Sequence, residues 1–174
     1  MDRQEQIEIL VDHYDNPRHR HPLPDPDVIM PGGNPGCGDI ITVYLRAGDE
    51  GKLIADVSWD GEGCTISQAA ASIVMEMAHD EEWTLEQVLE HDYNTMIEIL
   101  GKEAVQMRPK CATLALGTLK AAVRKYQRDQ LRRQHGLAAS DPLPDDVADE
   151  FGIVIGDDAL QERGRSSPVP DPLG

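Results

Sequence analysis

The hydrophobic positions near the start of the chain recur at helical spacing. Apolar residues at positions 7, 10, 11 and 14 follow the 3.6-residue period, and Asn16-Pro17 can end the helix, so a helix is predicted over residues 4–15. Prolines and glycines dominate residues 18–38, which are predicted to form a loop with a short strand at 28–30.

The next part of the chain changes to an alternating pattern. Residues 39–46 place Ile41, Val43 and Leu45 on one face, and residues 53–59 place Leu53, Ala55, Val57 and Trp59 on one face. Because only the turn at 48–51 separates these two stretches, they are predicted to pair as an antiparallel hairpin.

Helical spacing returns after the hairpin. Either Thr65 or Ser67 is expected to be the N-cap of the next helix, and Thr84-Leu85-Glu86-Gln87 has the form of a capping box. The predicted helices cover about residues 67–78, 84–91, 94–100 and 111–134. This order of elements predicts an α+β domain in which helices pack on one face of a small antiparallel sheet.

The C-terminal part differs in composition. From residue 137 onward it carries nine acids, two arginines and five prolines, which is typical of a flexible segment. We therefore divide the chain into a folded domain, residues 1–135, and an acidic tail, residues 136–174, that is mostly flexible. The apolar residues 151–155 are expected to pack on the domain surface; a docking peptide is the alternative.

Composition narrows the classes of partner. The 174 residues are 40% hydrophobic but only 4% aromatic, so one domain with an aliphatic core is expected. The net charge of −16 argues against nucleic acids and anionic membranes as partners, whereas a basic protein is compatible. The polar N-terminus does not resemble a signal peptide, and no stretch reaches the ~18 apolar residues of a membrane helix. A cytoplasmic protein with reduced cysteines is therefore expected.

The three cysteines provide the candidate chemistry. Each of Cys37, Cys64 and Cys111 lies where a loop meets a predicted element, and Asp39 follows Cys37 by two residues. Cys64 precedes a helix, and Cys111 starts one beside Arg108 and Lys110; both settings favour the thiolate form. We expect Cys37, Asp39, Cys64 and Cys111 to meet at one metal or cluster site.

The ligand types leave more than one function open. Three thiolates and a carboxylate suit tetrahedral Zn²⁺ and equally suit an iron–sulfur cluster, which a carboxylate would hold loosely, as in a carrier. The alternatives are cysteines that are merely buried small side chains and a purely structural zinc site. His13 is interpreted as satisfied or solvent-facing, His19 and His21 as surface residues, and the basic residues of 124–133 as a solvated helix face or, less readily, a partner surface.

Four motifs resemble those of one known family. Asn34-Pro-Gly-Cys-Gly-Asp39, the stretch from Gly61 to Ser72 around Cys64, and Arg108-x-Lys-Cys-Ala-Thr-Leu114 are similar to the three cysteine motifs of the IscU/SufU/NifU-type iron–sulfur assembly scaffolds. Asp12-His-Tyr-x-Asn-Pro-Arg18 resembles the N-terminal signature of that family. The resemblance covers roughly residues 5–130.

The resemblance implies a fold, a chemistry and partners. It implies a SufE/NifU-like fold and a protein that accepts sulfur from a pyridoxal-phosphate-dependent cysteine desulfurase, binds iron, a [2Fe–2S] cluster or Zn²⁺, and passes cluster to apo acceptor proteins. Cys37, Cys64 and Cys111 would be the ligands and sulfur acceptors, Cys37 taking the persulfide. Asp39 would be the fourth zinc ligand, with Arg108 and Lys110 in support.

Two departures keep two functions open. Lys110 stands where IscU proteins have a histidine, and Gln-Met-Arg-Pro, residues 106–109, replaces their chaperone-recognition segment, so recognition by an Hsp70-type chaperone is not expected. The third motif resembles that of SufU, whereas the spacing between Cys64 and Cys111 is short as in IscU. A cluster scaffold is the first hypothesis, and a zinc-dependent sulfurtransferase that relays persulfide and activates the desulfurase is the second, which leaves open whether the protein is an enzyme.

Overall fold

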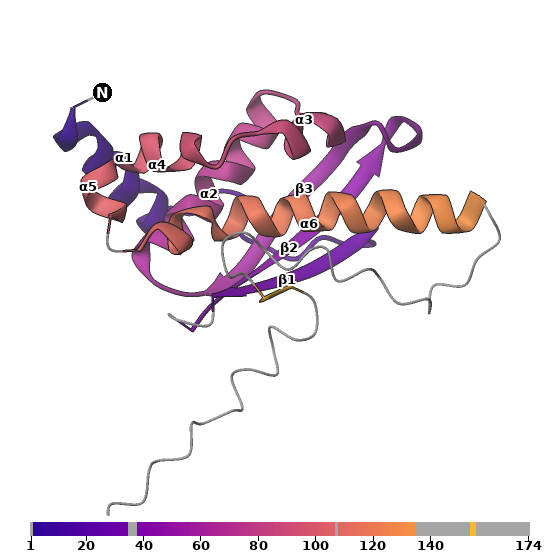
Figure 1. The fold of residues 1–174 in the computed structure, drawn as a ribbon, viewed down its shortest axis with the longest axis horizontal. Helices are drawn as coiled ribbons and strands as arrows, with labels where there is room; N and C mark the ends of the chain where they lie inside the picture. The colour runs from indigo at the N-terminus through magenta and orange to yellow at the C-terminus, as the bar shows by residue number, and fades with distance from the viewer. Residues whose placement is uncertain (1, 35–37, 107, 135–153, 156–174) are drawn as a thin grey trace, which may run out of the picture.

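A computed structural model describes residues 2–34, 38–106, 108–134 and 154–155. The described residues form an α+β fold, as predicted, in which an antiparallel sheet packs against helices (Figure 1). The strands are β1 (Val28–Asn34), β2 (Asp39–Gly48), β3 (Leu53–Glu62) and β4 (Val154–Ile155).

The sheet has the strand order β3-β2-β1-β4. The predicted hairpin is the pair β2–β3, joined by the short 3-10 helix η1 (Asp49–Gly51). β1 continues to Asn34, four residues beyond the predicted strand, because it pairs with β2 along its whole length. β4 falls within the apolar stretch 151–155 and pairs with Gly32 and Gly33 of β1. The rest of that stretch, 151–153, lies outside the described residues.

A register shift corrects the predicted inward face of β3. Val57 and Trp59 are fully buried, as expected, but Leu53 is 41% exposed and Ala55 is exposed as well. The pairing of β2 with β3 shifts between Arg46 and Ala47, which is a β-bulge, and beyond it Ile54 packs against the core instead. A bulge reverses the alternation of inward and outward side chains, so strict alternation over the whole strand was wrong.

The helices occupy nearly the predicted positions. They are α1 (Arg3–Asp15), α2 (Thr65–Asp80), α3 (Leu85–Glu90), α4 (Asn94–Leu100), α5 (Lys102–Val105) and α6 (Pro109–Gln134). The capping box at Thr84 is present, since its hydroxyl accepts the N–H of Gln87. The single-turn helix α5 was not predicted.

The core lies between the sheet and two long helices. α2 packs on β3, and α6 packs on β1 and β2. The inward strand residues Ile41, Val43 and Leu45 are fully buried, as their alternation predicts. α2 and α6 contact each other, so their N-terminal ends are held at the same end of the sheet, where β2 begins and β3 ends.

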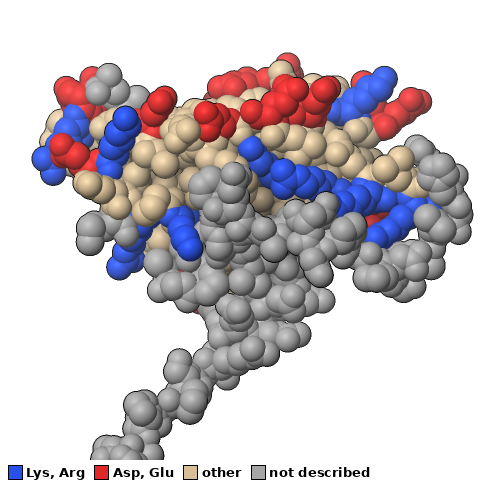
Figure 2. All heavy atoms as spheres, in the orientation of Figure 1, with Lys and Arg blue, Asp and Glu red and all other residues tan. Residues whose placement is uncertain are grey.

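Charge is unevenly distributed on the face shown in Figure 2. Acidic side chains gather along the upper edge of that view, whereas a stripe of lysine and arginine side chains follows α6. This stripe corresponds to the basic run within residues 124–133.

Candidate metal centre

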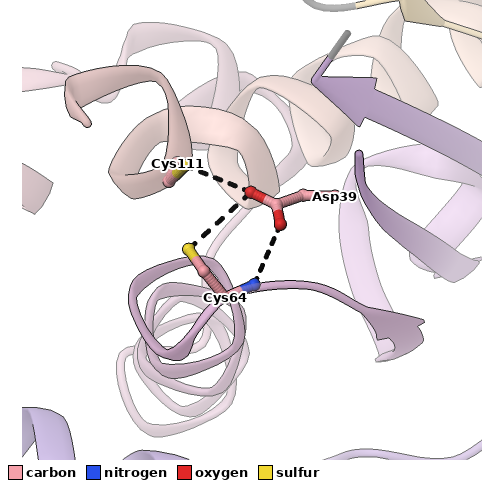
Figure 3. Close-up of side chains that lie close together, drawn as sticks. All are labelled: Asp39, Cys64 and Cys111. Carbon is pink, nitrogen blue, oxygen red and sulfur yellow. Dashed lines mark hydrogen bonds between the residues drawn. The ribbon is translucent and has the colours of Figure 1, made fainter. Parts of the chain in front are cut away.

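Asp39, Cys64 and Cys111 come together although up to 72 positions separate them in the chain (Figure 3). Asp39 is the first residue of β2, Cys64 is the N-cap of α2, and Cys111 lies in the first turn of α6. These three residues were predicted to share one site, and the structure brings them together.

The spacing of the ligand atoms suits a tetrahedral metal ion. Oδ2 of Asp39 lies 3.1 Å from Sγ of Cys111 and 3.7 Å from Sγ of Cys64, and the three ligand atoms lie within 4.8 Å of one another. Zinc bonds of about 2.0–2.3 Å at tetrahedral angles place neighbouring ligand atoms roughly 3.3–3.8 Å apart. Without metal, both thiols donate to this carboxylate oxygen, so a bound cation would replace two S–H protons.

The carboxylate of Asp39 is held in a fixed orientation. Its side chain is buried, and its other oxygen, Oδ1, accepts the backbone N–H of Cys64 at 2.9 Å. Gly63 makes this contact sterically possible, because a Cβ added there would lie 2.8 Å from Oδ1 of Asp39 and 2.4 Å from Oγ of Ser67. The glycine before Cys64 therefore makes the space in which the carboxylate sits.

A hydrogen-bond network positions Cys64. Ser67 is not the N-cap, as one prediction had it, and neither is Thr65; Cys64 itself is the N-cap, and the hydroxyl of Ser67 donates to its carbonyl at 3.0 Å. Arg20 donates to the carbonyl of Gly61 and to Gln68, whose amide in turn donates to the carbonyl of Gly63. Sequence reasoning missed Arg20, which lies in a proline-rich stretch, far along the chain from Cys64.

Cys111 is the most enclosed of the three ligands. Its side chain is fully buried, while Cys64 is partly exposed. Pro109 is the first residue of α6, where a proline costs no hydrogen bond, so the helix begins two residues before Cys111. The N-terminal ends of α2 and α6 both direct partial positive charge at the centre, which suits a negatively charged ligand set.

Of the other predicted site residues, the structure describes Arg108 and Lys110 but not Cys37. Cys37 lies outside the described residues, so its place in the site stays a prediction. Arg108 and Lys110 are exposed at the start of α6.

Among the described residues, no histidine belongs to this centre. His13 is buried, with Nδ1 2.8 Å from the hydroxyl of Ser72 and Nε2 3.3 Å from Glu76. Of the two predicted possibilities, satisfied or solvent-facing, the structure shows the first. His21 is exposed. His19 corrects the prediction of a surface residue, because it is partly buried and stacks on His79 with ring centroids 3.8 Å apart.

Comparison with known proteins agrees with the geometry. The family model described as the NifU-like N terminal domain matches residues 5–133. The chain belongs to this family. The match contains all three cysteines and the whole of the described centre.

The relatives carry two different functional descriptions. A protein of Archaeoglobus fulgidus described as the iron–sulfur cluster assembly scaffold protein IscU 1 is 33% identical over 119 residues, which cover 68% of this chain and 74% of the relative. The zinc-dependent sulfurtransferase SufU of Bacillus subtilis is 32% identical over 135 residues, covering 69% of this chain and 90% of the relative.

A solved structure supports the fold. The crystal structure of the putative SufU scaffold protein of Fervidobacterium islandicum has a TM-score of 0.58 at 25% identity, covering 67% of this chain and 94% of that chain. Among the described residues, no helix is long and apolar enough to cross a bilayer.

Proposed function

We propose that this protein is an iron–sulfur cluster assembly scaffold that accepts sulfur from a cysteine desulfurase. The observation that carries the proposal is the convergence of Asp39, Cys64 and Cys111 within 4.8 Å. Two thiols and one oriented carboxylate are three of the four ligands that a metal ion or a nascent cluster needs, and Cys37 would be the fourth. A carboxylate ligand lets the cargo leave more readily than a further thiolate would.

Cys37 is the sulfur acceptor in this proposal. Its thiolate attacks the terminal sulfur of the desulfurase cysteine persulfide; the new S–S bond forms on Cys37, the S–S bond of the donor breaks, and the donor cysteine leaves as a thiolate. Cys111 is fully buried, so it is poorly placed to meet the donor first and serves as a ligand instead. The cluster, with its iron, is the cargo that is passed to an apo acceptor protein.

A zinc-dependent sulfur relay is the second candidate function. Lys110 precedes Cys111, and a lysine ammonium group offers only donors and no lone pair for a metal, which leaves Cys111 as the ligand of this motif. Asp39, Cys64 and Cys111 fit Zn²⁺ by ligand type and spacing, and Cys37 would complete the set. Zinc, when bound, would keep these thiols deprotonated and hold them in place.

One reconstitution experiment separates the two functions. The protein is purified without oxygen and given a cysteine desulfurase, cysteine and ferrous iron. A red-brown absorbance that moves to an apo acceptor supports the scaffold. Tightly held zinc, no coloured species and faster desulfurase turnover would support the relay. If the protein bound no metal and formed no cluster, that result would contradict both functions.

A variant tests the acceptor. Cys37→Ser lacks the nucleophilic thiol and should lose sulfur acceptance, measured by mass spectrometry of the persulfide after a single desulfurase turnover. Normal sulfur acceptance by this variant would remove Cys37 from the proposed role while leaving the metal centre untouched.

A further inference from the structure

The C-terminal half of α6 carries a stripe of positive charge in an acidic protein. Residues 124–133 contain five bases and one acid, against a net charge of −16 for the chain. Arg124, Arg128 and Arg132 recur every four residues, so they follow one side of the helix. The acid, Asp129, pairs with Lys125 at 2.7 Å and with Arg132 at 3.6 Å. Because one acid stands against five bases, the stripe keeps a strong excess of positive charge.

Part of this stripe lies on the side of α6 that faces β1. Thr118 contacts β1 so closely that a Cβ on Gly32 would lie 2.0 Å from its hydroxyl. Lys125 and Arg132 follow Thr118 by seven and fourteen residues, close to two and four full turns, so they lie along the same side of the helix. These two cations therefore lie on the side of α6 that borders β1.

The end of α6 and the strand β4 lie at opposite ends of β1. At the C-terminal end of α6, Asp129 and Arg133 line one small pocket together with Asp27, the residue before β1. At the other end, β4 pairs with Gly32 and Gly33, near the end of β1. The residues that connect α6 to β4 must therefore be long enough to span β1 from Asp27 to Gly32.

The residues that connect these two points have the complementary charge. Within residues 141–150 there are five acids and no base: Asp141, Asp145, Asp146, Asp149 and Glu150. We propose that the basic stripe of α6 is a docking surface for this chain's own acidic segment 141–150, with β4 as its anchor on the sheet edge. Docking keeps the stripe from other anionic partners and holds β4 against Gly32 and Gly33 of β1, which lie close to Cys37 in the sequence.

Hydrogen–deuterium exchange on the full-length protein tests the proposal. The variant Arg124→Glu/Arg128→Glu/Arg132→Glu should speed exchange in peptides that cover residues 141–155, and at Gly32 and Gly33, by roughly 3- to 30-fold, the effect of losing three surface ion pairs. In the wild-type protein, raising the ionic strength from 0.02 M to 0.5 M should have the same direction of effect, because the Debye length falls below about 5 Å.

Two further variants make the result specific. Arg3→Glu/Lys52→Glu/Lys102→Glu changes the net charge equally at exposed positions outside the basic stripe and should leave exchange of 141–155 unchanged. Asp145→Lys/Asp146→Lys/Asp149→Lys should speed exchange by itself, and combined with the α6 triple variant it should restore slow exchange. This variant does not alter α6, so it tests the docking even if the α6 variant unfolds.

Three results would overturn the proposal. The first is that the exchange rate of residues 141–155 does not respond to either triple variant or to salt. The second is that the control variant speeds this exchange as much as the α6 variant does. The third is that combining the two triple variants does not restore slow exchange. None of these results depends on metal binding or sulfur acceptance, so they leave the proposed function as it stands.

Discussion

At the scale of single residues, the site depends on a few close contacts, and only some of the residues that make them could be predicted from the sequence. Cys64, Cys111 and Asp39 could be chosen from the sequence because thiols and carboxylates are ligands and each follows a loop. The contribution of Gly63 could not be chosen, since glycines are common in turns and only the structure shows that a Cβ would meet Asp39 and Ser67. Whether Cys37 joins them stays a prediction.

Gly63→Ala should weaken zinc binding by roughly 10- to 100-fold, the usual cost of disturbing a group that orients a ligand. The new methyl group displaces the Asp39 carboxylate or Ser67, and the crowding should also cost about 1–3 kcal/mol of stability. A competition titration with a chromophoric chelator measures the affinity.

Gly48→Ala is the matched control, because it lies in the hairpin and its Cβ would meet only Ala55, at 3.1 Å. Equal zinc affinity of the Gly63 variant and the wild-type protein would show that the carboxylate is not held as the structure indicates.

At the scale of elements, periodicity predicted the fold class, the hairpin and the main helices, whereas long-range pairing was not accessible. The bulge after Arg46 depends on how β3 meets β2, and the partner of β4 lies more than a hundred residues away in the chain. The sequence likewise predicted only that His13 is satisfied or solvent-facing, and it did not reveal that His13 links α1 to Ser72 and Glu76 of α2.

The His13 contact makes stability depend on pH. Burial, and to a lesser extent the nearby Arg18 cation, lowers the pKa of His13 below its ordinary value. The unfolded chain therefore binds a proton more readily than the folded protein, so the free energy of unfolding is highest above about pH 6.5 and falls as the pH decreases below it.

Urea unfolding between pH 7.5 and 5.5 checks this dependence. His13→Gln removes the titrating ring and should flatten the decrease, while His21→Gln, a change at an exposed histidine, should leave it as in the wild-type protein. A decrease of the same size in the His13 variant would contradict the assignment; His19 and His91, whose pKa values burial also lowers, would then account for it.

At the scale of the whole molecule, the candidate centre joins three elements that begin at one end of the sheet: β2, α2 and α6. The order of these elements could be predicted, but their convergence depends on how α2 and α6 pack on the sheet. A metal that bridges them should bind the folded state far better than the unfolded chain and thus stabilise the entire fold.

Zinc should therefore raise the unfolding temperature. At a free zinc concentration of 100 times the dissociation constant, the gain is about 2.7 kcal/mol, which corresponds to roughly 5–15 °C for a domain of this size. Scanning calorimetry in chelator and in zinc measures the shift. Asp39→Asn keeps an oxygen for the Cys64 N–H but loses the charge, so its shift should be clearly smaller; an equal shift would exclude Asp39 as a ligand.

The most direct test of the central claim is X-ray absorption at the zinc edge on protein loaded with one equivalent of zinc. We expect at least two sulfur ligands at about 2.3 Å and at least one oxygen at about 2.0–2.2 Å, with the oxygen contribution changed in Asp39→Ala. A first shell of nitrogen and oxygen alone would show that Cys64 and Cys111 do not bind the metal, and would contradict the account.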